Sequence, residues 1–381
     1  MAGTEKPLPR YPLISGLYHV VPLDADRVEV CNAGRSFVLR GERFSEKVMP
    51  LLDALDGTKT VDELAGSFPE LVPALLEGLS RRGVLVDAAP PDEEDTSPYS
   101  LTAAAVADAL SPAEIRQRLG AATVVFVGCA PVLAEAALHL AKARVNRLVL
   151  IDGGLVTAHD VTVSPGLDAR AEGRPRVDVV RALCGRDSRE GVEIATLDGS
   201  DGGVDGSDGS FALRGDVAFE DAMASANLVV IEARPQGEAW APKEADLALS
   251  KGIPYLLFSQ DALEAFVGPA VSLGGEPCHR CADMRRQGHV DNLDEFLAYR
   301  RHRAETSPLP DAFLSAHTSF LGGLLATEAL RAVLGIPGLA QRGVVVVDLA
   351  EMKLEREEVL PVPGCEGCES APSRFDDEFE G

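Results

Sequence analysis

The sequence has 381 residues, of which 46% are hydrophobic, and a formal net charge of −24. The length allows two domains, and the negative charge argues against non-specific binding of nucleic acid, because phosphates would be repelled. No apolar run is long enough to span a membrane. From the charge we expect no nucleic acid among the partners, and from the lack of such a run we expect no membrane.

The first part of the chain predicts a small module of three strands, three helices and a closing strand. Turn residues separate the strands at hairpin spacing, Thr60 and Glu63 form a capping box, and Gly83 ends the last helix. We therefore expect a winged-helix-like α+β module at residues 1–87 and an exposed linker, rich in proline and acid, at 88–100. The predicted segments lie at residues 17–21, 27–31, 36–40, 44–55, 60 onward, 71–79 and 84–86.

The remainder, residues 101–381, predicts a Rossmann-type, mostly parallel α/β sheet. Thr123–Val127 is an unbroken apolar run typical of a strand buried on both faces, and Gly128 turns the chain into a helical pattern. A second apolar strand ends at Asp152, which completes a βαβ unit. Further buried strands are expected at residues 192–197, 228–232, 254–258 and 344–349.

Two Cys-x-x-Cys pairs, Cys278 with Cys281 and Cys365 with Cys368, supply four thiolates, the full ligand set of a structural zinc ion. Two disulfides or two redox pairs are the alternatives. A closed four-sulfur site leaves no position for water, so we expect Zn²⁺ to be structural, with His279 pointing to solvent. The other three cysteines, an odd number, are typical of a reducing compartment, and no apolar segment marks a signal peptide, so we expect a cytoplasmic protein.

The turn after the first buried strand has the general layout of a nucleotide site, with Gly128 at the turn and Asp152 at the end of the next strand. Only the first glycine of the usual glycine-rich pattern is present, and Pro131 removes a backbone N–H that could bind phosphate. Asp152 has a plain alternative role, which is to cap its strand or the following turn.

Residues 101–370 resemble the ThiF/MoeB family, whose members adenylate a C-terminal carboxylate with ATP and magnesium and hold a structural zinc. The resemblance runs through residues 125–128, 147–153, 173–176, 268–281 and 322–335 and the terminal cysteine pair. At the family's Asn-x-x-Arg segment stand Asp160 to Val163, at its lysine stands Arg176, and at its magnesium-binding Asp-Asn stands Arg234-Pro235. From these departures we expect Gly128, Asp152 and Arg176 to be vestigial, with no ATP bound and no catalytic residue. The family also suggests a homodimer.

Residues 1–87 resemble the PqqD-like module that recognises leader peptides, through residues 16–18, 34–36 and 55–58. The combination of the two halves resembles the ocin-ThiF-like partner proteins of azoline-forming (TOMM) pathways of antibiotic biosynthesis. That resemblance implies a non-catalytic chain, which binds the leader of a ribosomal precursor and delivers its core to a separate YcaO-family cyclodehydratase.

A leader peptide would add to the edge of the strand at residues 36–40 and place side chains between that strand and the third helix. The helix leucines have a plain alternative as core, and the arginines as solvated surface. The candidate peptide-binding residues are Arg35, Ser36, Phe37, Val38, Leu39, Arg40, Leu75, Leu76, Leu79 and Arg82.

Three other functions are weighed against peptide delivery. The first is an active ATP-dependent enzyme that adenylates a peptide carboxylate, against which Val163 and Arg234 speak. The second is a nicotinamide-dependent oxidoreductase, favoured only by the strand, the turn and Asp152. The third is a structural adaptor in an unrelated complex.

Overall fold

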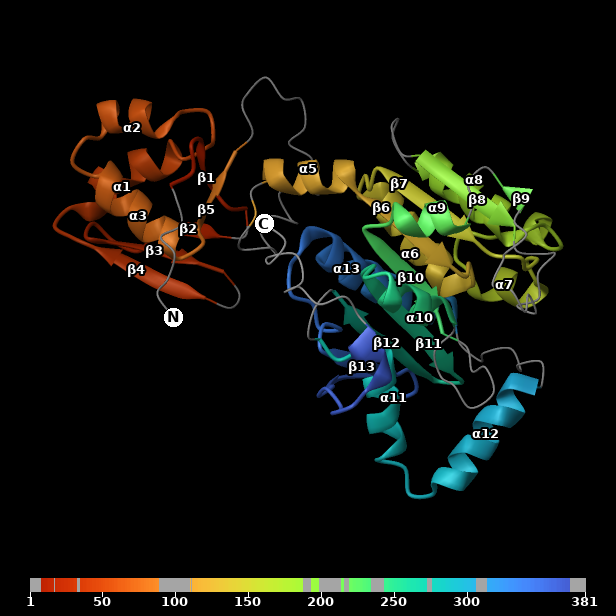
Figure 1. The fold of residues 1–381 in the computed structure, drawn as a ribbon. Helices are drawn as coiled ribbons and strands as arrows, with labels where there is room; N and C mark the ends of the chain where they lie inside the picture. The colour runs from red at the N-terminus through yellow and green to blue at the C-terminus, as the bar shows by residue number, and fades with distance from the viewer. Residues whose placement is uncertain are drawn as a thin grey trace, which may run out of the picture. The chain divides into compact units, whose positions relative to one another are not determined.

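The structure is a computed structural model that describes residues 8–16, 18–32, 35–88, 110, 112–187, 193–198, 214–215, 219–233, 243–272, 276–305 and 314–370 (Figure 1). The chain divides into two compact units, Met1–Arg118 and Leu119–Gly381. Most of the predicted linker at 88–100 lies outside the described residues, as do Leu17, Gly34, Arg234 and Pro235.

The first unit has an antiparallel three-stranded sheet, in the order β2-β3-β4, and a separate antiparallel pair of β1 with β5. The element order agrees with the predicted module, apart from β1 at the start. Thr60 and Glu63 form the expected capping box at the start of α2. The elements are β1 (Pro12–Ile14), β2 (His19–Pro22), β3 (Arg27–Cys31), β4 (Ser36–Arg40), α1 (Phe44–Asp53), α2 (Val61–Ser67), α3 (Val72–Arg81) and β5 (Leu85–Asp87).

A small core between the three-stranded sheet and the helices holds this unit together. Val28 and Val30 alternate on β3 and are fully buried, as are Leu51 of α1 and Leu76 of α3. The spacing of leucines in α3 places them on one helix face, and burying that face stabilises the helix more than its intrinsic propensity does.

The second unit has a nine-stranded mixed sheet in the order β14-β13-β12-β11-β10-β6-β7-β8-β9. Its strands are β6 (Thr123–Val127), β7 (Arg147–Ile151), β8 (Glu193–Asp198), β9 (Arg214–Gly215), β10 (Leu228–Glu232), β11 (Tyr255–Asp261), β12 (Glu264–Val271), β13 (Gly343–Asp348) and β14 (Lys353–Glu358). Helix α5 (Pro112–Ala121) crosses the boundary between the two units. The helices of the second unit are α6 (Pro131–Lys142), α7 (Ala158–Val163), the 3₁₀ turn η1 (Ala169–Ala171), α8 (Arg176–Asp187), α9 (Phe219–Ala224), α10 (Lys243–Ser250), α11 (His279–Gln287), α12 (Leu293–Glu305), α13 (Ser315–Leu334) and α14 (Glu366–Ser370).

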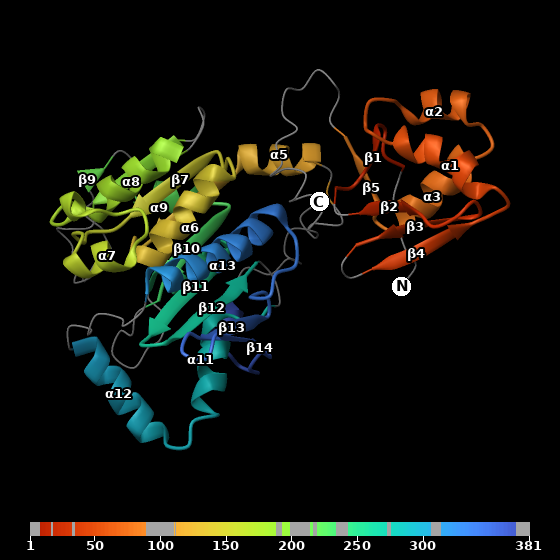
Figure 2. The ribbon, with the colours of Figure 1, turned by 180° about the vertical axis from the view of Figure 1, so that it is seen from behind.

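The centre of this sheet is parallel, from β11 through β10, β6 and β7 to β8, and both of its flanks are antiparallel. Helices α6, α8 and α13 cover one face (Figure 2), and α9 and α10 cover the other. The prediction of a mostly parallel sheet therefore holds for the centre only: the strand expected at residues 344–349 is present as β13, but it runs antiparallel beside β12. No helix in the described part of the chain is long and apolar enough to cross a membrane.

Helices α6 and α13 pack closely because the chain has a glycine at their crossing. A Cβ atom added to Gly322 of α13 would lie 2.6 Å from the Cβ atom of Glu135 on α6. The neighbouring Gly323 has open space around the equivalent position. Gly322 thus fixes how near α13 comes to α6, the helix that starts at the Gly128 turn.

Candidate functional site

The carboxyl ends of the parallel strands bring together residues that are far apart in the sequence, as expected for the ligand-binding edge of an open α/β sheet. Gly128 follows β6, Asp152 follows β7 and Glu232 ends β10. Gly128 has a φ of +100°, and a Cβ atom added to it would lie 2.6 Å from a carboxylate oxygen of Glu232. Only glycine fits this turn, for reasons of both conformation and space.

Asp152 is half-buried, and its carboxylate accepts hydrogen bonds from two nearby backbone N–H groups. Its carboxylate accepts a hydrogen bond from the Cys129 N–H at 2.6 Å and another from the Gly154 N–H at 2.5 Å. The first of these bonds ties the turn after β6 to the end of β7. It also occupies the N–H that a phosphate would use in a glycine-rich cradle.

Arg176, at the start of α8, is held by carboxylates. Its guanidinium donates to Asp160 at 2.9 and 3.1 Å and lies 3.9 Å from Asp152. Asp160 is buried and also accepts the Thr157 N–H at 2.8 Å within the capping box of α7. Val163, which stands where the ThiF/MoeB family has an arginine, is buried at the end of α7. The structure therefore brings Gly128, Asp152 and Arg176 to one edge.

An open hollow of about 440 Å³ lies beside this turn, lined by Cys129, Glu135, Asp160, Arg176 and mainly apolar residues of α6 and α8. Burial raises the pKa of the Cys129 thiol, and the negative charges of Asp152 and Glu232 raise it further. The thiol is therefore protonated at neutral pH and is a poor nucleophile there.

These residues fit the two ends of ATP unequally. A carboxylate at the end of the second strand is the usual partner of a ribose, and Asp152 occupies that place. Arg176 is a half-buried cation whose carboxylate partner a phosphate could replace. The backbone cradle is weaker, because Pro131 has no N–H and Glu232 brings negative charge to Gly128. The described residues thus fit the ribose and one phosphate contact, with a cation needed to offset the carboxylates.

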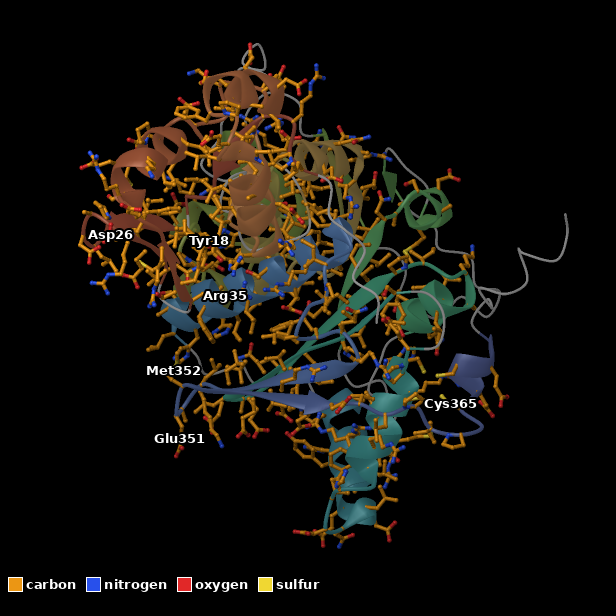
Figure 3. All side chains as sticks on the ribbon, turned by 90° about the vertical axis from the view of Figure 1, so that its left-hand side faces the viewer. Tyr18, Asp26, Arg35, Glu351, Met352 and Cys365 are labelled. Carbon is orange, nitrogen blue, oxygen red and sulfur yellow. The ribbon has the colours of Figure 1, made fainter. Side chains whose placement is uncertain are left out.

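The four predicted metal ligands lie together in the second unit. The Sγ atoms of Cys278, Cys281, Cys365 and Cys368 are all within 4.8 Å of one another. Cys278 and Cys365 are 3.6 Å apart, and Cys281 and Cys368 are 3.4 Å apart, too far for disulfides. A tetrahedral ion with bonds of about 2.3 Å to sulfur separates its ligands by roughly 3.8 Å. The cluster can therefore hold a metal ion, and Figure 3 labels Cys365 just before α14.

The prediction that His279 points to solvent is wrong, because its side chain is buried. Its Nδ1 lies 2.8 Å from the Tyr255 hydroxyl, and its Nε2 lies 3.1 Å from an oxygen of Asp246. Arg280 donates to the same Asp246 oxygen at 2.9 Å. This network fixes the first cysteine pair against β11 and α10. The sequence reasoning missed it because its members come from three separate elements.

The predicted peptide-binding residues surround strand β4, which pairs only with β3 among the described strands. Phe37, Val38 and Leu39 are partly exposed, while Arg35, Ser36 and Arg40 are exposed. The Arg82 guanidinium lies 5.0 Å from the centre of the Phe37 ring. Figure 3 labels Arg35, which directly precedes β4.

The three leucines of α3 have a different environment. Leu76 and Leu79 are fully buried in the unit's own core, and Leu75 is 9% exposed. In this structure a peptide on β4 would therefore contact Phe37, Leu39 and Arg82 rather than the leucines of α3.

Comparisons with known proteins give a fold match without a sequence match. The sequence matches no protein-family model and no curated protein. The structure of E. coli MccB aligns with a TM-score of 0.68 and 13% identity, over 94% of this chain and 96% of that chain. An E. coli MccB structure with ATP gives a TM-score of 0.67 and 13% identity over 94% and 99% of the two chains. PaaA gives 0.62 and 19% identity over 91% of this chain and 99% of that chain.

The prediction of a non-catalytic chain is contradicted by these matches. MccB is described as a microcin biosynthetic enzyme in a structure that contains N-formylated MccA, and another of its structures contains ATP. The expectation that no ATP is involved conflicts with the same finding. Identities of 13% and 19% establish the fold and leave the substrate open. The chain has the ThiF/MoeB-like fold that it shares with MccB.

Proposed function

We propose that this chain is an enzyme that uses ATP to activate a carboxylate of a bound peptide. The observation that carries the proposal is the length of the match to MccB, which takes in 94% of this chain and so includes parts of both compact units. Among the MccB structures, one contains ATP and another contains N-formylated MccA. A match of the sheet alone would say less, because one fold serves many chemistries.

The roles of the chain's own residues at the turn follow from their contacts. Asp152 would accept the ribose hydroxyls while keeping the Cys129 N–H in place, and Arg176 would exchange Asp160 for a phosphate oxygen. Asp160 keeps its bond from the Thr157 N–H in that exchange, so α7 need not unwind. When bound, ATP would supply the adenylyl group that makes a carboxylate reactive, with pyrophosphate as the leaving group.

The peptide would be held in part by the first unit, as an added strand on β4. Main-chain hydrogen bonds along the edge of a strand give affinity, and the partly exposed Phe37 and Leu39 give register. The Arg82 guanidinium lies over the Phe37 ring and helps to hold it in place. A leader segment of a ribosomal precursor remains our prediction for this surface.

A YcaO-family partner, a homodimer and azoline formation also remain predictions. Activation of a carboxylate by this chain needs no second enzyme, so co-purification with a YcaO-family protein tests that partner separately. Zn²⁺ is our proposal for the ion at the four cysteines, because four thiolates in a closed shell favour it.

The test is pyrophosphate exchange into ATP by the purified full chain, with magnesium and a panel of short peptides. Exchange that depends on one peptide is the expected result. Arg176→Ala and Asp152→Asn should each lower it by roughly tenfold or more. Arg181→Ala, on the exposed side of the same helix as Arg176, is the matched control and should retain exchange.

Failure of the wild-type chain to bind ATP at millimolar concentration, measured by calorimetry with magnesium present, would overturn the proposal. Nucleotide binding that Arg176→Ala leaves unchanged would overturn the role given to Arg176.

A further inference from the structure

A second hollow lies at the same edge of the sheet, at the carboxyl ends of β10 and β11. It is open, measures about 450 Å³, and is closed on its other side by α11 and α12. The side chains that define its character are Phe266, Arg286, Phe296, Tyr299, Arg300 and Arg303. Three guanidinium groups and three aromatic rings are an unusual lining in a chain with a net charge of −24.

Two of the three arginines have carboxylate partners. Arg300 lies 2.6 Å from Asp283, and Arg303 lies 2.8 Å from Asp261. The Tyr299 hydroxyl also donates to Asp261, at 3.0 Å. These contacts join α12 to α11 and to the end of β11, and they balance the charges of both arginines.

Arg286 is different. No carboxylate among the described residues lies within 4.0 Å of its guanidinium, which stacks instead over the rings of Phe266 at 4.2 Å and Phe296 at 5.8 Å. Burial and the charge of Arg300 lower its pKa, while the more distant Glu264, Asp283 and Asp261 act in the opposite direction.

A half-buried cation without an anion is costly, because burial takes away solvation that no partner replaces. The two aromatic faces return only part of that cost. A carboxylate entering the hollow would pair with Arg286 in the two-pronged geometry that guanidinium favours, and the rings would contact its hydrocarbon stem.

We propose that this hollow binds a carboxylate of the peptide substrate, either an acidic side chain or a C-terminus, as an anchor beside the reacting group. The proposal rests on the proposed function in so far as the ligand is a peptide. The hollow spans the ends of β10 to β12, so the strand order places it two to four strands from β7 and Asp152, roughly 10–19 Å away. A carboxylate is favoured over a phosphate as the ligand of this hollow, because the aromatic rings beside Arg286 can contact the hydrocarbon stem that a carboxylate carries. The proposed phosphate contacts lie elsewhere, at the ends of β6 and β7.

The test is an NMR titration of the full chain, labelled at arginine, which follows the side-chain Nε–Hε signals without ATP. The probes are N-acetylglutamate α-amide for a side-chain carboxylate, N-acetylglycine for a C-terminus, N-acetylglutamine amide as the neutral control, and inorganic phosphate. We expect saturable shifts of the Arg286 signal with one or both carboxylates and none with the neutral amide. Arg286→Gln should weaken that binding by about tenfold or more, while Arg301→Gln, an exposed neighbour on α12, should not.

Whichever carboxylate binds more tightly identifies the source of the anchor. No saturable shift with either carboxylate, or tighter binding of phosphate than of both, would overturn the proposal. Because the titration contains no nucleotide, its failure leaves pyrophosphate exchange intact, and failure of exchange leaves the titration intact.

Discussion

Removing the metal should destabilise the second unit far more than the first. The cysteine pairs join α11 to the segment that ends in α14, and α14 has only five residues, too few to be stable as an isolated helix. Sulfur separations of 3.4 to 3.6 Å need little adjustment to reach the roughly 3.8 Å of a tetrahedral zinc site. Structural zinc binding is worth about 10–16 kcal/mol in small peptides. In a chain with a large sheet core we expect several kcal/mol of unfolding free energy, lost with the ion.

The pH dependence of zinc retention follows from the thiols. Burial raises the pKa of Cys281 to about 11 and that of Cys278 further. Burial also acts to raise the pKa of Cys365, but hydrogen bonds from the Cys368 and Gly367 N–H groups and from neighbouring thiols outweigh it and lower that pKa. In the metal-free chain at neutral pH, the thiols of Cys278 and Cys281 are therefore protonated. Zinc must displace protons to bind, so its affinity should rise with pH and fall as the solution is acidified.

The assay is elemental analysis together with calorimetric unfolding, with and without a zinc chelator. We expect one zinc per chain, a lower unfolding temperature for the second unit after chelation, and an unchanged transition for the first. Cys365→Ser should reproduce the effect, and Cys31→Ser, which removes a thiol from β3 in the first unit, should retain the zinc. A chain that carries no metal as isolated, and whose unfolding the chelator leaves unchanged, would refute this reasoning.

Three further predictions concern stability. Gly322→Ala should cost about 1–3 kcal/mol by forcing α13 away from α6, whereas Gly323→Ala should be neutral or slightly stabilising, as denaturant unfolding would show. Leu76→Ala should destabilise the first unit by about 2–5 kcal/mol, while Phe37→Ala should cost less stability and weaken peptide binding; equal losses of stability would contradict their assigned places. The hydrogen bond from His279 lowers the pKa of Asp246 to about 2. Because this side chain is 43% exposed, we expect the ionised carboxylate to add only about 1 kcal/mol to the free energy of unfolding. That stabilisation is present above pH 4 and is lost as the pH falls towards 2. Asp246→Asn should remove that acid dependence.

The parts of the fold that could be predicted from the sequence are those whose burial is written in the local pattern. Strands β6 and β7 are buried on both faces and read as unbroken apolar runs. Strand β14 has the sequence KLEREE and no buried residue, so no alternation marks it. Strand β12 contains a Gly-Pro pair, which argues against a strand although the segment is buried.

The candidate site divides in the same way. The spacing of the four cysteines in two close pairs predicts a metal site from the sequence alone, and the structure brings their sulfur atoms together. The contact of Glu232 with the Gly128 turn joins residues about a hundred positions apart, and no local pattern announces it. That Arg286 has no carboxylate partner among the described residues is likewise a property of what packs around it, and the sequence alone does not reveal it.

The carboxylates at the sheet edge lead to a last prediction, about magnesium. Asp152, Asp160 and Glu232 face the Gly128 turn with Arg176 as their nearby cation, so the bound nucleotide would add its own negative charge to a site that is already negative. At low effective dielectric such repulsion amounts to several kcal/mol unless a cation offsets it. Nucleotide binding should therefore depend strongly on magnesium.

Glu232→Gln removes the charge closest to Gly128, so it should lessen that dependence by strengthening binding in the absence of magnesium. Glu351→Gln, at the tip of the β13–β14 hairpin, removes the same charge far along the chain from the turn and serves as the control. Titration of ATP by calorimetry, with and without magnesium, compares the three proteins. If Glu232→Gln left the magnesium-free affinity unchanged, the carboxylate would not face the phosphates, and the nucleotide would have to lie elsewhere on this edge of the sheet.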